Sequence, residues 1–133
     1  TDCPDVTDLL PINKPLGVIG ETIDASGSLQ ACAPAADNFE TFYSASGSPA
    51  LKVDVLGANH MSFIEDPDTC GLPCSFCNAP VVTNDVVTGI ARSYLVAFFG
   101  RHLRGQQGYD LFLTGEAAVS RYVDTGLATI ASK

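Results

Sequence analysis

The stretch PLGVIG, residues 15–20, is a short and continuous apolar run that ends at a glycine. Such a run is typical of a strand that is buried on both faces of a parallel sheet. Residues 50–57, ALKVDVLG, alternate apolar and polar side chains and indicate a second strand. Between them, residues 34–46 carry apolar side chains at helical spacing. The order strand, helix, strand predicts a βαβ unit of a parallel sheet.

Beyond the second strand, residues 81–105 change to a helical periodicity that predicts a long helix, buried along most of its length. Thr83 or Asn84 is suited to cap its N-terminus, and Gly105 is suited to end it. A last short helix is expected at residues 116–123. Two strands alone would leave open sheet edges. We therefore expect residues 1–133 to be the C-terminal part of a single, larger α/β domain.

Charge and hydropathy argue against two kinds of interaction. Its 133 residues carry seven Lys and Arg against fifteen Asp and Glu, a net charge of −8. So acidic a chain does not neutralise a phosphate backbone, and we expect no nucleic-acid binding. No apolar run approaches the roughly 20 residues that a membrane-spanning helix needs, so we expect no membrane span.

Three of the five cysteines lie in the eight residues CGLPCSFC, residues 70–77. The spacing C-x3-C-x2-C, with Phe76 before the last cysteine, is also that of the [4Fe-4S] site in radical-SAM enzymes. Only 56 residues follow Cys77, however, too few for the barrel that such an enzyme needs. A zinc site would need His60 or His102 as fourth ligand, and the sequence has no second Cys pair. We interpret the cluster as a disulfide staple and expect neither metal nor cofactor.

Cysteines this frequent in a short chain favour an oxidising compartment, so we expect a secreted or periplasmic protein. The three clustered cysteines lie in a disulfide-rich insertion at about residues 65–80. The pairing stays open, and because five is an odd number, at least one thiol is free or pairs outside the chain. The candidates for disulfides are Cys3, Cys32, Cys70, Cys74 and Cys77.

Residues with catalytic chemistry follow both predicted strands. Glu21 and Asp24 come after the first strand, and His60 comes after the second. The carboxyl ends of parallel strands meet at one edge of a sheet, so an acid and a histidine can meet there. A carboxylate bonded to an imidazole fixes its tautomer, which is two thirds of a catalytic triad. Taken singly, an aspartate such as Asp24 in a Gly/Ser loop is more often a solvated turn residue, and a lone His60 is an ordinary loop histidine more often than a catalytic one; their joint placement favours the catalytic interpretation.

Three segments, GVIGETIDA, VLGANHMSF and IARSYLVAFFGRHLRGQQGYDLFLTG, resemble the C-terminal part of an α/β-hydrolase. The resemblance is to the secreted polyester hydrolases, which are cutinase-like or PET-hydrolase-like, and to the chlorophyllase-like esterases, and it covers roughly residues 15–115. It implies that Asp24, four residues past Gly20, is the triad acid, and that His60 in its G-A-x-H turn is the triad histidine. An aromatic helix face with a Tyr and Phe-Leu tail also matches, through Tyr94, Phe98, Phe99, Tyr109, Phe112 and Leu113.

The nucleophile of that family lies in a G-x-S-x-G elbow that precedes the acid and the histidine. No serine of this chain has glycine two residues before and two after it. The resemblance therefore implies a serine-bearing N-terminal segment as partner, with the odd cysteine as a possible link between two chains. We interpret Thr1, in place of a starting methionine, as a cleavage point between the two parts.

The expected function is serine-dependent hydrolysis of small or polymeric carboxylic esters. His60 would transfer the proton and Asp24 would orient His60, with Glu21 as the second choice of acid. Met61 and Phe63 either contact the ester or pack under their loop. The alternative function is a non-catalytic, disulfide-stapled, secreted binding or structural module.

Overall fold

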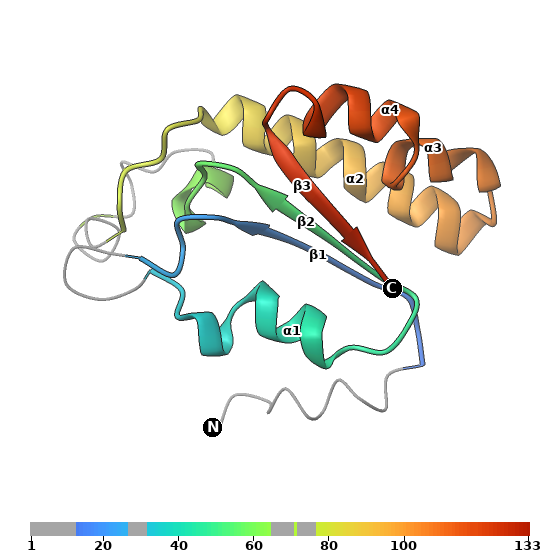
Figure 1. The fold of residues 1–133 in the computed structure, drawn as a ribbon, viewed down its shortest axis with the longest axis horizontal. Helices are drawn as coiled ribbons and strands as arrows, with labels where there is room; N and C mark the ends of the chain where they lie inside the picture. Colours follow the sequence, from blue (N-terminus) through green and yellow to red (C-terminus); the bar gives the residue numbers. More distant parts are fainter. Residues whose placement is uncertain (1–12, 27–31, 65–70, 72–76) are drawn as a thin grey trace.

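The computed structural model describes residues 13–26, 32–64, 71 and 77–133 of the chain. These residues form a mixed α/β fold around one three-stranded sheet of order β1-β2-β3 (Figure 1). β1 (Leu16–Glu21) and β2 (Ala50–Val55) are parallel, as predicted, and Leu16 pairs with Ala50. β3 (Ala128–Ser132) runs antiparallel to β2.

The connection between β1 and β2 is helical, which confirms the predicted βαβ order. A 3₁₀ turn, η2 (Ala35–Asp37), comes before α1 (Phe39–Ala45). The predicted helix began five residues too early, because Asn38 has extended backbone and caps α1 by accepting a hydrogen bond from the Glu40 amide at 3.0 Å. Of the apolar residues at helical spacing, Ala36 lies in this separate turn and the aromatic ones lie in α1.

The two faces of the sheet carry different helices. α1 covers one face and α2 (Asn84–Arg104) covers the other (Figure 1). A Cβ atom added to Gly20 would lie 2.0 Å from the Phe39 ring of α1, and one added to Gly17 would lie 3.0 Å from the Phe98 ring of α2. The close approach of α1 to β1 therefore requires glycine at position 20, and that of α2 leaves little room for a side chain at position 17.

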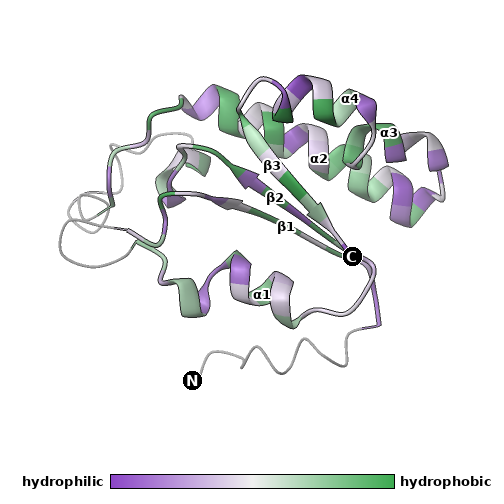
Figure 2. Cartoon of the chain, in the orientation of Figure 1, coloured by the Kyte–Doolittle hydropathy of each residue, from purple (hydrophilic) through white to green (hydrophobic). Residues whose placement is uncertain are grey.

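The main core lies between the sheet and α2. Val53, Val55, Ile90 and Tyr94 are at most 2% exposed and belong to one buried cluster. The opposite side chains of β2, Lys52 and Asp54, face α1, where Lys52 forms an ion pair with Glu40. This alternation of apolar and polar residues along β2 is visible in Figure 2.

The long helix has the predicted ends, with Thr83 as N-cap and Gly105 as C-cap in the left-handed conformation at φ 66°. The prediction that it is mostly buried was wrong for one side. Its exposed apolar residues, between 47% and 78% exposed, are Leu95, Val96, Phe99 and Leu103. None of the described helices is long and apolar enough to span a membrane.

Short helical segments lead from α2 to β3. They are η6 (Gln107–Tyr109), α3 (Asp110–Leu113), α4 (Glu116–Ala118) and the π turn η7 (Val119–Val123). The helix predicted at residues 116–123 is confirmed as α4 followed by η7. The count of two strands was wrong, because β3 pairs with β2 and covers its second edge. No strand of the described residues pairs with the outer edge of β1.

Candidate active site

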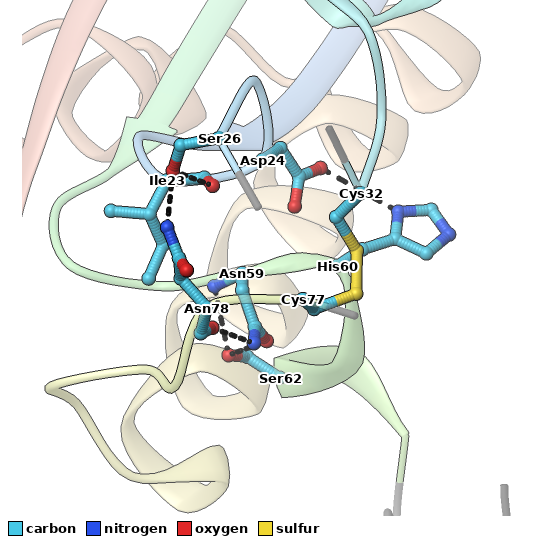
Figure 3. Close-up of a disulfide and its surroundings, with 9 residues drawn as sticks. All are labelled: Ile23, Asp24, Ser26, Cys32, Asn59, His60, Ser62, Cys77 and Asn78. Atoms are coloured by element: carbon cyan, nitrogen blue, oxygen red, sulfur yellow. Dashed lines mark hydrogen bonds and ion pairs between the residues drawn. A yellow bond between two sulfur atoms is a disulfide. The ribbon is translucent and has the colours of Figure 1, made fainter. Parts of the chain in front are cut away.

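Asp24 and His60 meet beyond the ends of the two parallel strands, as predicted. The Nδ1 atom of His60 lies 3.5 Å from Oδ2 of Asp24. The Asp24 side chain is 2% exposed, whereas that of His60 is 63% exposed. The arrangement therefore presents a histidine to solvent with a buried acid behind it (Figure 3). The separation exceeds an ordinary N–H···O hydrogen bond, which is common for catalytic pairs without substrate.

Hydrogen bonds hold together the two loops that carry this pair. The amide of Gly57 donates to Oγ1 of Thr22 at 2.8 Å, and the amide of Ile23 donates to the carbonyl of Ala58 at 3.2 Å. Gly57 has φ +74°, so this turn after β2 favours glycine. These bonds fix the loop of Asp24 to the loop of His60 on the side of the strand ends.

A third segment braces the same site. Nδ2 of Asn59 donates to the carbonyl of Asn78 at 2.7 Å, and Nδ2 of Asn78 donates to Oγ of Ser26 at 3.0 Å. Asn59 also forms a capping box with Ser62, in which each accepts a hydrogen bond from the other residue. These roles were not predicted from the sequence, although Asn three residues ahead of Ser is a usable capping signal.

One disulfide joins the segments on either side of the pair. Cys32 is bonded to Cys77, at a Cα–Cα distance of 4.9 Å (Figure 3). Next to Cys32, the amide of Ala33 donates to the carbonyl of Asp24 at 2.9 Å. Next to Cys77, Asn78 binds Asn59. The staple interpretation is thus confirmed for Cys77, which leaves this cysteine no thiolate to offer a metal cluster.

The remaining cysteine predictions concern Cys3, Cys70 and Cys74, which lie outside the described residues, as does most of the expected insertion at about residues 65–80. The sequence left the disulfide pairing open, and in the structure Cys32 pairs with Cys77 of the cluster.

Glu21 is the last residue of β1 and is 6% exposed. Burial, together with the neighbouring carboxyl groups of Asp24 and Asp54, raises its pKa to about 9. Glu21 therefore holds a proton at neutral pH, and a protonated acid does not stabilise an imidazolium ion. This electrostatic difference favours Asp24 over Glu21 as the partner of His60.

A pocket of about 450 Å³ opens at the pair. Its apolar wall includes Phe39, Phe42 and Phe63, and its polar wall includes Asp24 and His60. Phe63 therefore lines the pocket, as one of its two predicted roles requires, whereas Met61 does not line it. Phe39 and Phe42 were predicted only as the apolar side of a helix, and their part in the pocket depends on how α1 crosses β1.

No protein-family model, curated protein or solved structure matches the chain.

Proposed function

We propose that the chain supplies the acid and the histidine of a serine hydrolase that cleaves carboxylic esters. The observation that carries the proposal is the pair of Asp24 and His60, joined at 3.5 Å beyond the ends of two parallel strands. The acid is buried and the histidine faces a pocket with an aromatic wall. Apolar walls with a few convergent polar groups are typical of sites for small organic molecules.

In the proposed reaction, His60 accepts the proton of a serine hydroxyl as its oxygen attacks the ester carbonyl. Asp24 holds the imidazole through Nδ1 and stabilises the imidazolium ion that forms. His60 then returns the proton to the departing alcohol, and the acyl group stays on the serine. Water, activated by His60 in the same way, attacks this acyl group and releases the carboxylic acid product. Phe63, Phe39 and Phe42 offer apolar contact to the ester.

The serine would come from a segment outside these 133 residues, since none of their serines has the G-x-S-x-G frame. The outer edge of β1 supports this proposal. Leu16 and Thr22 donate their amides toward β2, so the alternate amides of Gly17 and Ile19 point to the outer edge. A parallel strand added at this edge would end beside Asp24 and His60, which is where a nucleophile is needed.

The surface beside the β1 edge also supports a partner segment. A groove on the α2 side of β1 is lined by Gly17, Ile19 and the Phe98 ring. Leu95 and Phe99, which complete its wall, are 47% and 51% exposed. A partner segment that covered these side chains would be stabilised by about 25 cal/mol for each Å² of apolar surface that becomes buried.

A reactive-serine probe tests the proposal directly. The protein is isolated from its native source without reductant and treated with a fluorophosphonate, and the labelled peptide is identified by mass spectrometry. We expect the label on a serine outside the 133 residues, and we expect a second polypeptide in the intact mass spectrum or a longer single chain. An unlabelled, lone chain without ester hydrolysis would refute the proposal and favour the non-catalytic, disulfide-stapled module.

Secretion or export to the periplasm belongs to the same proposal. The Cys32–Cys77 disulfide supports an oxidising compartment, because such bonds persist there and are rare in the cytosol.

A further inference from the structure

Glu21, Asp24 and His60 also have the composition of a metal site. One ligand atom from each residue lies within 4.8 Å of the ligand atoms of the other two. Carboxylate oxygen and imidazole nitrogen are ligands of Zn²⁺ and of related divalent ions. Glu21 would release its proton when the ion binds, since metal ligands bind in their deprotonated form. We propose that these three side chains bind a divalent ion of the zinc class, and that this ion competes with the catalytic arrangement.

An unpartnered oxygen atom supports the proposal independently of the cluster itself. Oδ1 of Asp24 is buried and has no hydrogen-bond partner in the described part of the chain. The other oxygen of this carboxyl group, Oδ2, lies 3.5 Å from Nδ1 of His60. Burial removes the water molecules that would bind a carboxylate oxygen, and without a donor no hydrogen bond replaces them. A metal ion among the three side chains would satisfy it.

The charge around the site favours a cation. The pocket that contains the three residues also has Asp37 in its wall, and no Lys or Arg is among the described residues that line it. Among the described residues, the ion pairs of Lys and Arg involve Glu40 and Asp110, not Glu21 or Asp24. Carboxyl groups in one concave site attract divalent cations when they are ionised and no basic residue offsets their charge.

The geometry requires only a modest adjustment. Zinc binds oxygen and nitrogen at about 2.0–2.2 Å, so neighbouring ligand atoms of a tetrahedral ion lie about 3.3 Å apart. The His60 and Asp24 atoms, at 3.5 Å, are already close to this separation. The widest allowed separation of 4.8 Å would have to shrink by about 1.5 Å. The His60 side chain is 63% exposed, so its ring can move by this amount. Three protein ligands would leave the fourth position open to water.

An ion bound to Nδ1 of His60 would replace the contact of this atom with Asp24. It would also hold the imidazole away from a serine. The bound ion should therefore inhibit ester hydrolysis. This inhibition rests on the proposed function, whereas the binding of the ion does not.

Calorimetric titration of the 133-residue protein with ZnCl₂ tests the binding. The protein is kept oxidised and its remaining thiols are alkylated, so that cysteines do not compete for the ion. We expect one saturable site, and we expect Asp24→Asn, His60→Ala and Glu21→Gln each to weaken it at least tenfold. Asp54→Asn and His102→Ala, a partly buried acid and a histidine outside the cluster, are the matched controls and should bind as the parent does.

Absence of a saturable site would overturn the proposal, and so would equal affinity in Asp24→Asn, His60→Ala and the parent. Circular dichroism of each variant identifies any loss of binding that reflects misfolding, and Co²⁺ in place of Zn²⁺ gives a visible spectrum that His60→Ala must alter. If zinc binds and ester hydrolysis is undiminished, the proposal that the ion competes with catalysis is overturned. Failure of serine labelling would leave the binding result intact, so the two proposals fail separately.

Discussion

Asp24 and His60 stand at matching places after two paired strands, with 3.5 Å between Oδ2 and Nδ1. Glu21 and Val55 pair at the ends of β1 and β2. Asp24 follows Glu21 by three residues, and His60 follows Val55 by five. The meeting of the acid and the base therefore follows from the parallel register of the sheet, and the bonds between their loops then fix the distance.

The first prediction concerns this pair. In the active protein, Asp24→Asn should lower kcat by about 10⁴-fold, because the amide no longer holds the reactive tautomer of His60 or stabilises its charge. His60→Ala should abolish hydrolysis of a p-nitrophenyl ester to at least the same extent. His102→Ala serves as the control, since His102 packs against Phe98 on α2. Equal activity in Asp24→Asn and the parent would exclude Asp24 as the triad acid.

The second prediction concerns pH. The pKa of Glu21 is raised from its ordinary value of 4.5 to about 9 in the folded chain, so the folded state binds more protons than the unfolded state between these values. The free energy of unfolding should therefore fall as pH rises from about 4.5 to about 9. Urea titrations in metal-free buffer at several pH values measure this slope.

Glu21→Gln isolates the effect of this one group. The variant keeps a neutral side chain of similar shape at all pH values, so its stability should decline less over the same pH range. An identical decline in the variant and the parent would show that other groups cause it. Asp54→Asn is the variant for comparison. Burial also raises the pKa of Asp54, so this variant measures how much of the decline comes from the neighbouring acid and not from Glu21.

The third prediction concerns the disulfide. Cys32 and Cys77 are separated by 45 residues, and their bond restricts the unfolded chain. The double variant Cys32→Ser/Cys77→Ser should lose about 2–4 kcal/mol of stability. Because the neighbours of both cysteines bind the loops of Asp24 and His60, ester hydrolysis should fall as well. Thermal unfolding and activity at a temperature where both proteins stay folded separate these two effects.

The fourth prediction concerns a buried hydroxyl group. Tyr94 is 2% exposed, and its hydroxyl has no hydrogen-bond partner in the described residues. Burial raises the pKa of this hydroxyl, so it stays protonated and unsatisfied. Tyr94→Phe should therefore raise the free energy of unfolding by about 1 kcal/mol. Tyr122→Phe tests the neighbouring ring, whose centroid lies 5.6 Å away, and should bring no such gain. A loss of stability in Tyr94→Phe would mean that the hydroxyl is satisfied in solution.

The sequence was sufficient for the parts that local rules control. The alternation in ALKVDVLG fixed the strand and its faces, because Val53 and Val55 point to the core while Lys52 points to α1. The end of α2 at Gly105 follows from backbone preference. The placement of Asp24 and His60 followed from the rule that parallel strands end at one edge.

The parts that were missed depend on distant contacts. The segment ATIAS has a weak strand pattern of its own, and it becomes β3 because the free edge of β2 accepts it. The exposure of Leu95 and Phe99 depends on how far the described strands extend beside α2, which no local pattern reports. The proton on Glu21 comes from burial beside two other carboxyl groups, of which only Asp24 is near in the sequence.

The bonds from Thr22 to Gly57 and from Asn59 to Asn78 have a consequence for assembly. They keep the acid and the base in place through contacts within this chain alone, whatever occupies the outer edge of β1. Under the proposed function, a separately produced serine-bearing fragment should therefore restore activity when it is mixed with the 133 residues. The gain on mixing would depend on the fit at the β1 edge, since the loops of Asp24 and His60 are already held together within this chain.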